Sequence, residues 1–249
     1  MSKDAFVDPY LIAGTDVLVN LVGAKTQSEL MRAEPLLVTL ASTRLRGERM
    51  AVEGTIAQLQ EIHKALFRKV YPWAGEFRTV DISKGGSTFL PVAFLETGAQ
   101  YVESVLHEDD MFRGMDRRTF IERLSVNYDN LNNLHPFREG NGRAQRFFWE
   151  LVARDAGWYF DWGLVTKEFN DQASIAAMRN DDLSLLERMF DTIVKPLSEP
   201  LVAGPDPKAL GRGKYVPSKI SSIKLDSSQY SILYERYIGS RRKKADEPY

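Results

Sequence analysis

Apolar residues recur every three or four positions along three segments, and this periodicity limits the fold more than any other feature of the sequence. The first stripe covers residues 56–70 and should end before Pro72, because proline cannot continue a helix. The second stripe covers residues 120–134 and leads directly into His135. The third covers residues 141–157, where a glycine marks the carboxyl end. The sequence therefore predicts helices, with a tight loop between the second and the third.

The pattern changes between Gly75 and Pro91, where the sequence reads GEFRTVDISKGGSTFLP. Short runs of β-forming residues flank Gly85-Gly86, and paired glycines allow the positive φ angles that a hairpin turn needs. We therefore expect an all-α fold, a helical bundle, with one small β-hairpin.

Length and composition allow one sizeable core, because the chain has 249 residues and 43% of them are hydrophobic. Cysteine is absent, which excludes a disulfide framework, thiolate zinc sites and cysteine nucleophiles. No apolar run reaches the roughly 18 residues of a membrane span, and the amino terminus lacks a leader pattern. These features predict a cytoplasmic protein that does not bind membranes.

A change of composition near residue 198 divides the chain into a domain of residues 1–197 and a linker with a C-terminal extension, residues 198–249. The segment after the boundary is rich in proline and glycine, and strand-like alternation follows it. The extension carries ten Lys and Arg against six Asp and Glu, while residues 1–197 carry 23 against 28. Because no broad basic surface is expected, direct binding of nucleic acid is not predicted, and the basic run near the end is interpreted as a solvated terminus.

Residues 135–146 read HPFREGNGRAQR, and their local chemistry is that of an anion site. Glycines at the start of a helix let backbone N–H groups face a ligand, and the positive end of the helix dipole attracts phosphate oxygens. Arg143 and Arg146 are three residues apart, so both guanidinium groups can face the same side. Such a loop is suited to a polyphosphate.

Two further residues of this loop suggest catalysis. Glu139 lies among basic groups and could hold Mg²⁺ together with phosphate oxygens, although an ion pair with Arg138 or Arg143 is the alternative. His135 is the nearby group that could take a proton from an attacking hydroxyl. A base, an anion cradle, a metal ligand and two arginines together indicate phosphoryl or nucleotidyl transfer.

The segment 135–146 matches the HPFx(D/E)GNGRxxR signature, so the chain resembles the Fic (Fic/Doc) family, with similarity that covers roughly residues 8–197. The resemblance implies a protein AMP transferase (AMPylase) that moves AMP from ATP, with Mg²⁺, to a Tyr, Ser or Thr hydroxyl of a target protein. It implies a general base at His135 and a magnesium ligand at Glu139. The remaining implied residues are the nucleotide-binding loop, comprising Phe137 as its anchor, Gly140, Asn141, Gly142, Arg143 and Arg146, and a target-docking flap, comprising Lys84, Gly85, Gly86, Ser87 and Thr88.

Many Fic proteins carry an inhibitory helix with the pattern S/T-x-x-x-E-G/N, and this sequence lacks it. Only Glu53-Gly54 and Glu139-Gly140 supply the final dipeptide, and neither has Ser or Thr four residues earlier. The resemblance to the group inhibited by a separate antitoxin therefore implies a small partner protein that supplies a glutamate to Arg146. By resemblance alone, the target of such toxin-type enzymes is often a type II topoisomerase.

Three functions remain open at this point. The first is AMP transfer, the second is a Doc-like kinase that uses the same loop to transfer the terminal phosphate, and the third is a nucleotide-binding module without turnover. The intact GNGR disfavours the kinase, and the intact His135 disfavours the binder. His63 and His107 are assigned structural or surface roles, and a metal site at His107 with Asp109 and Asp110 is a weak alternative. The adenine pocket is expected to involve residues after Gly157, in the region of residues 170–182, and no individual residue is assigned to it.

Overall fold

A computed structural model describes residues 7–197 and 220–223 of the chain. Seven α-helices lie in this part: α1 (Gln27–Gly47), α2 (Ile56–Phe67), α3 (Leu95–Glu108), α4 (Arg117–Leu134), α5 (Asn141–Asp155), α6 (Lys167–Asn180) and α7 (Ser184–Ile193). The strands are β1 (Asp81–Lys84), β2 (Ser87–Thr88), β3 (Trp158–Phe160), β4 (Val194–Pro196) and β5 (Ile220–Ile223). Short 3₁₀ turns cover Val92–Phe94, Asp110–Phe112 and Trp162–Leu164. The prediction of a helical bundle is confirmed.

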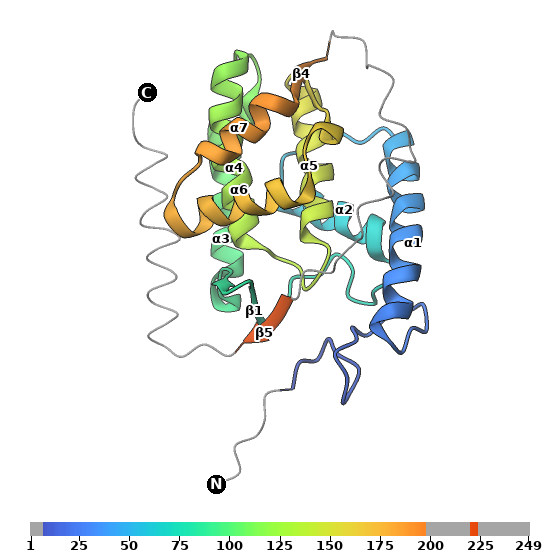
Figure 1. Ribbon diagram of the computed structural model, residues 1–249. Helices are drawn as coiled ribbons and strands as arrows, with labels where there is room; N and C mark the ends of the chain where they lie inside the picture. The colour runs from blue at the N-terminus through green and yellow to red at the C-terminus, as the bar shows by residue number, and fades with distance from the viewer. Residues whose placement is uncertain (1–6, 198–219, 224–249) are drawn as a thin grey trace.

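The helices surround a central pair, α4 and α5 (Figure 1). Helix α3 packs on α4, helix α2 packs on α5, and α1 packs on the outer side of α2. Helices α6 and α7 contact each other and cross the front of α4 in the view of Figure 1. No helix in the described residues is both long and apolar enough to cross a membrane.

Helix α4 is the centre of the core, since 13 of its 18 residues are buried. Asp116 caps its amino end by accepting hydrogen bonds from the amides of Arg118 and Thr119. Several of its buried polar groups are paired: Asp109, just after α3, accepts from Arg123 at 2.7 Å and from Asn127 at 2.8 Å. A helix that is buried on nearly all sides needs such partners, because unpaired polar groups in the core are costly.

The three predicted helical stripes are present as α2, α4 and α5. Helix α2 ends at Phe67, a little earlier than the stripe suggested, because a turn follows before Pro72. Helix α4 begins directly after Asp116, as expected, and α5 ends at Asp155. The predicted hairpin is β1–β2, and both turn glycines have positive φ, 56° at Gly85 and 78° at Gly86.

Two β pairings were not predicted. Strand β3 pairs antiparallel with β4, so the segment after α5 is joined to the segment after α7. Strand β5 pairs antiparallel with β1 and extends the hairpin to a three-stranded sheet in the order β2-β1-β5. This strand lies where strand-like alternation was noted, while the remainder of the extension, residues 198–219 and 224–249, lies outside the described residues.

Arg78 joins the hairpin to the carboxyl end of α4. Its side chain is buried, at 1% exposure, and donates to the carbonyls of Val80 at 2.9 Å, Leu90, and His135 at 2.9 Å. The last carbonyls of a helix have no intrahelical donor, and a cation near them is favourable. One guanidinium therefore holds the hairpin, the chain after it and the end of α4 together.

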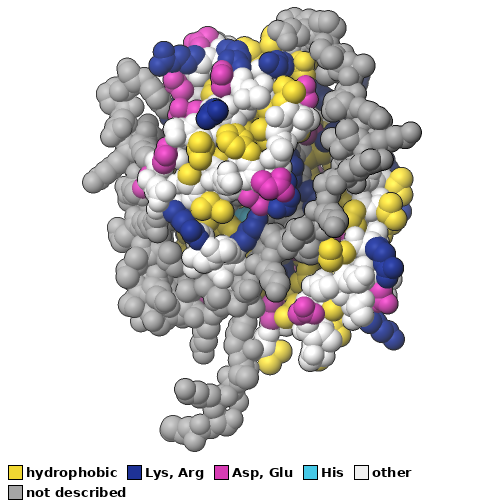
Figure 2. All heavy atoms as spheres, viewed as in Figure 1, with side chains coloured by type: hydrophobic (Ala, Val, Ile, Leu, Met, Phe, Trp, Pro, Cys, Tyr) yellow, Lys and Arg dark blue, Asp and Glu magenta, His cyan; other side chains and the backbone are white. Residues whose placement is uncertain are grey.

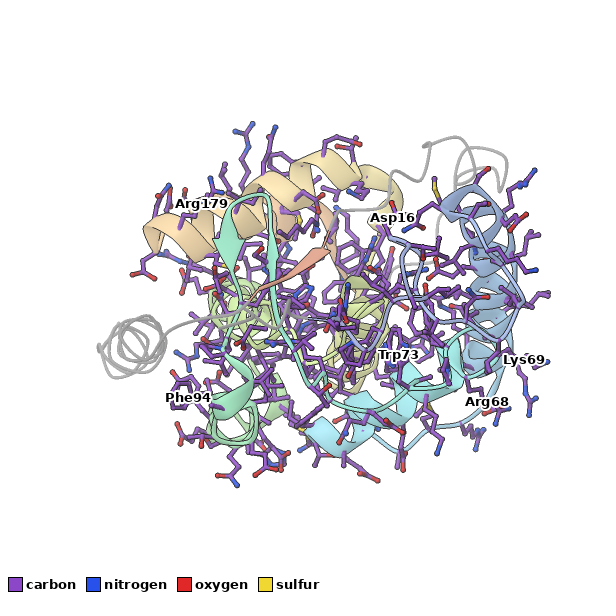
Figure 3. All side chains as sticks on the ribbon, turned by 90° about the horizontal axis from the view of Figure 1, so that it is seen from below. Asp16, Arg68, Lys69, Trp73, Phe94 and Arg179 are labelled. Atoms are coloured by element: carbon purple, nitrogen blue, oxygen red, sulfur yellow. The ribbon has the colours of Figure 1, made fainter. Side chains whose placement is uncertain are left out.

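We predict that Arg78→Met lowers the free energy of unfolding by about 2–4 kcal/mol, because several buried carbonyls lose their donor at once. The matched control is Arg68→Met, since Arg68 is exposed and points outward in Figure 3, and its effect should stay within about 0.5 kcal/mol. Urea denaturation followed by circular dichroism measures both. Equal losses for the two variants would contradict the role given to Arg78.

Candidate active site

Residues 135–140 form the loop between α4 and α5, and two positive φ angles shape it. His135 ends α4 in the left-handed region, with φ 42° and ψ 60°. Gly140 precedes the first turn of α5 with φ 87°, and a Cβ there would lie 2.5 Å from Cζ of Phe67. Glycine is therefore required at position 140 both by backbone conformation and by the ring behind it.

The loop is held from the protein interior. Asn141 bonds to both main-chain groups of Phe137: its side-chain amide donates to the carbonyl at 2.7 Å, and its oxygen accepts from the amide at 2.9 Å. Phe137 is fully buried and stacks on His63 at 3.8 Å between ring centroids. His63 accepts a hydrogen bond from the amide of Gly75 through Nδ1, so Nε2 carries the proton and donates to the carbonyl of Glu139 at 2.9 Å. The structural role that we expected for His63 is therefore to support the loop from behind.

The imidazole of His135 is oriented with one nitrogen toward the backbone. Its Nδ1 lies 3.1 Å from the carbonyl of Asn132, and a carbonyl can only accept, so Nδ1 carries the proton. This leaves a lone pair on Nε2. The ring is 8% exposed and stacks on Phe89 at 3.7 Å. Burial, aided by the charges of Arg78 and Lys84, lowers the pKa of His135 to about 3, so the ring is neutral at physiological pH.

A pocket of about 260 Å³ opens in front of this loop. Figure 2 shows basic and acidic side chains gathered around the middle of this face. Four parts of the chain line it: the hairpin with the residue after β2, the carboxyl half of α4, the 135–146 loop with the start of α5, and α6. The lining residues are Lys84, Gly85, Phe89, Tyr128, Asn132, His135, Glu139, Gly140, Asn141, Gly142, Arg143, Gln145, Arg146, Lys167, Asn170, Asp171, Ser174, Ile175 and Met178.

The two loop arginines have different surroundings. Arg143 forms an ion pair with Glu34 of α1 at 2.6 Å, lies 3.4 Å from Glu139, and its guanidinium carbon is 4.7 Å from the centroid of the Phe67 ring. Arg146 donates to the carbonyl of Gly142 at 3.1 Å, and within the described residues no carboxylate lies at ion-pair distance from it. Arg143 is therefore fixed, whereas Arg146 keeps donors for a ligand.

Glu139 does not form the surface pair with Arg138 that remained open from the sequence. Arg138 instead makes a buried ion pair with Asp8 at 2.9 Å, which ties the amino-terminal segment to the loop. Glu139 accepts from the amide of Gly140 at 3.0 Å through Oε1 and lines the pocket. The other alternative, an ion pair of Glu139 with Arg143, is present at 3.4 Å, although the pair of Glu34 with Arg143 is shorter, at 2.6 Å. Both of these contacts of Glu139, with Gly140 and with Arg143, use Oε1, so Oε2 keeps capacity to accept further bonds.

Nine of the predicted site residues line this one pocket, namely Lys84, Gly85, His135, Glu139, Gly140, Asn141, Gly142, Arg143 and Arg146. Phe137 lies behind the loop instead, which agrees with an anchor and not with contact to a ligand. Gly86, Ser87 and Thr88 belong to the hairpin but do not line the pocket. Ser87 faces α6, because Arg179 donates to its hydroxyl at 2.7 Å.

The sequence analysis missed Glu34. It is 2% exposed, and burial raises its pKa although Arg143 acts in the opposite direction. A signal was present, because Glu34 stands between Leu30 and Val38 at four-residue steps on the buried face of α1. A carboxylate inside an apolar stripe points to a buried cationic partner.

The wall made by α6 was expected only as a region, residues 170–182. Asn170 accepts a hydrogen bond from the hydroxyl of Tyr128 at 2.9 Å, which fixes α6 on α4. Asp171 lies 2.6 Å from Lys167 and 3.6 Å from Lys84, so it joins α6 to the hairpin across the mouth of the pocket.

The alternative metal site at His107 gains no support. Within the described residues, no group of three or more His, Cys, Asp or Glu side chains could hold a metal ion. Asp109 uses both carboxylate oxygens for Arg123 and Asn127, and His107 is exposed.

Comparison with known proteins gives consistent matches. A family model described as the Fic/DOC family matches residues 54–153. The protein adenylyltransferase VbhT of Bartonella schoenbuchensis is 39% identical over 178 residues, which cover 71% of this chain and 37% of VbhT. The chain thus spans little more than a third of that relative. The probable protein adenylyltransferase Fic of Escherichia coli is 32% identical over 192 residues, which cover 77% of this chain and 94% of that protein.

Solved structures also match. BepC of Bartonella tribocorum with bound AMPPNP has a TM-score of 0.71 and 27% identity, over 75% of this chain and 96% of that chain. An N-terminal Fic domain of a Bartonella quintana effector with bound ADP has a TM-score of 0.73 and 26% identity, over 76% of this chain and 95% of that chain.

The two glycines of the loop should respond differently to alanine. We predict that Gly140→Ala lowers the free energy of unfolding by about 2–4 kcal/mol, because φ is 87° and the new Cβ meets Phe67. Gly142→Ala is the matched control: it lies in the first turn of α5, its nearest contact is Arg146 at 4.0 Å, and it should be neutral or stabilising by up to about 1 kcal/mol. Urea denaturation tests both, and a tolerated alanine at position 140 would refute the conformational requirement.

Proposed function

The chain belongs to the Fic/DOC family, and from this premise we propose that it is a protein adenylyltransferase that moves AMP from ATP to a Tyr, Ser or Thr hydroxyl of a target protein. The observation that carries the proposal is the lone pair of His135 Nε2 at the same pocket as the loop suited to phosphates. The curated relatives named as adenylyltransferases support this activity, and the AMPPNP and ADP bound to the structural neighbours support ATP as substrate.

The triphosphate would lie at the amino end of α5. The first-turn amides, at Asn141 and Gly142, have no intrahelical acceptors and would donate to phosphate oxygens, helped by the positive end of the helix dipole. Arg146 has guanidinium donors for the outer phosphates, and Arg143 adds a second positive charge. The nucleoside would then extend toward α6, where Ile175 and Met178 supply apolar contacts.

The reaction is an in-line displacement at the α-phosphate. The target hydroxyl oxygen forms a bond to the α-phosphorus while the bond to the bridging oxygen of the β-phosphate breaks, and pyrophosphate leaves with that electron pair. The hydroxyl proton passes to Nε2 of His135, which is neutral and therefore able to accept it. Asn132, by accepting from Nδ1, keeps the ring in the required tautomer.

The residues present fit a magnesium ion. Glu139 offers one carboxylate beside the phosphate cradle, and Mg²⁺ is usually held by one or two carboxylates together with substrate phosphates and water. When bound, the ion would neutralise negative charge on the phosphates during transfer.

Arg146 is also the basis for a regulatory partner. Because Arg146 has no carboxylate partner in the described part of the chain, and Glu34 pairs with Arg143 instead, we propose that a separate small protein supplies the inhibitory glutamate. A carboxylate at Arg146 would compete with the outer phosphates of ATP.

Labelled ATP tests the reaction. When the chain is incubated with Mg²⁺, cell lysate and ATP labelled at either the α- or the γ-phosphate, protein should acquire label from the α position only. Label from the γ position would indicate a kinase, and no transfer from either position would indicate a binder.

We predict that His135→Ala reduces transfer by about 10²–10⁴-fold while AMPPNP affinity changes little, because a general base is lost and the phosphate cradle is kept. His107→Ala, at an exposed position on α3, is the control and should retain full activity.

The lowered pKa of His135 predicts an unusual pH profile. A base accepts protons only when unprotonated, so a pKa near 3 extends the active range to lower pH than an ordinary imidazole, with a pKa of about 6.5, would allow. The kcat/KM for α-label transfer, which reports on the free enzyme, should stay level from about pH 8 to about pH 5.5. A rate that falls by half near pH 6.5 would contradict the burial of this ring.

A further inference from the structure

The β1–β2 hairpin, residues 81–88, has two edges to which another strand could be added. At the β2 edge, Arg179 of α6 donates to the hydroxyl of Ser87 at 2.7 Å and to the carbonyl of Gly85. Figure 3 shows Arg179 beside the tip of the hairpin. Helix α6 thus covers this edge, and the edge of β1 is the one left for strand addition.

The β1 edge is occupied by β5 from the C-terminal extension. The pairing is antiparallel and uses all four residues of β1: Asp81 pairs with Ile223, Ile82 with Ser222, Ser83 with Ser221, and Lys84 with Ile220. Figure 1 shows the two strands side by side. A segment more than 20 residues beyond α7 and β4 therefore returns to the hairpin.

The edge taken by β5 borders the candidate active site. Lys84, at the end of β1, lines the same pocket as His135. Phe89, which follows β2, stacks on the His135 ring at 3.7 Å and donates its amide to the carbonyl of Ile82 at 3.2 Å. A strand added to β1 is consequently placed at the rim of the pocket by the same hairpin that packs against the imidazole.

We propose that residues 220–223 act as an internal competitor for target binding. In this inference, which rests on the proposed function for its consequence, the segment occupies in cis the strand position that an extended segment of a target must take. The sequence Ile-Ser-Ser-Ile has the properties of such a segment, because it is extended and carries hydroxyl residues. The β1 edge is thereby shared between the extension and the target.

Strand addition relies on main-chain hydrogen bonds, so it tolerates many sequences. A segment tethered to the same chain competes at an effective concentration of about a millimolar, which short isolated peptides of weak affinity cannot match. A folded target with a second contact surface can displace the segment. The extension would therefore suppress transfer to random extended peptides and favour targets that also bind elsewhere on the domain.

A fluorescent peptide with the sequence of residues 217–226, PSKISSIKLD, tests the shared edge by anisotropy on the full chain. Ser221→Pro with Ser222→Pro removes two backbone donors from β5, whereas Ser221→Ala with Ser222→Ala keeps them and is the matched control. The proline variant should bind the peptide at least about tenfold more tightly than the wild type or the alanine variant, because the tethered competitor is gone.

Amide hydrogen exchange of residues 81–84 gives a second measurement on the same proteins. Exchange should be faster in the proline variant and should slow again when the peptide is added, while unchanged AMPPNP affinity shows that the domain is folded. Equal peptide affinity and equal exchange in all three proteins would overturn the inference, whether or not the chain transfers AMP. If the proline variant binds the peptide more tightly but no α-label reaches any protein, the sharing of the β1 edge is supported and the proposed function fails.

Discussion

The site depends on one buried cation at the end of a helix. Arg78 satisfies carbonyls from the hairpin, from the chain after it and from His135, and so fixes the left-handed turn at which α4 stops. A non-glycine residue at positive φ costs of order 1–3 kcal/mol and persists only where its surroundings over-determine it. That cation also helps to keep the neighbouring imidazole neutral. The interaction that positions His135 therefore also adds to the effect of burial, which is the main cause of the lowered pKa of its ring.

The two loop arginines divide the tasks of building and binding. Arg143 is held by the buried carboxylate of Glu34 and by the ring of Phe67, and this arrangement fixes a positive charge before any ligand arrives. Preorganised charge of this kind needs no rearrangement during a reaction. Arg146, bonded to the carbonyl of Gly142, keeps further donors. The same loop therefore combines a rigid electrostatic frame with one group that can respond to an incoming phosphate or carboxylate.

The parts predictable from sequence are those fixed by local rules. The end of α4 at His135, the glycine conformations at Gly85, Gly86 and Gly140, and the start of α5 all follow from proline, glycine and apolar periodicity, and the structure agrees. The parts that were missed depend on residues far apart in the chain. Glu34 meets Arg143 across more than 100 residues, and β5 meets β1 across more than 130. Periodicity can mark a buried carboxylate or a strand, but it does not name the partner.

Arg146 and the β1 edge are different parts of the candidate site, and this separation bears on how such a site could be controlled. A carboxylate that reaches Arg146 competes with the outer phosphates and so acts on nucleotide binding. A strand on the β1 edge pairs with the hairpin and, in the inference proposed above, competes with target binding. The first kind of inhibition is relieved by more ATP and the second by more target. Since inhibition at Arg146 and inhibition at the β1 edge involve different groups, a chain with this architecture can be inhibited at both, and each inhibition is relieved by a different ligand.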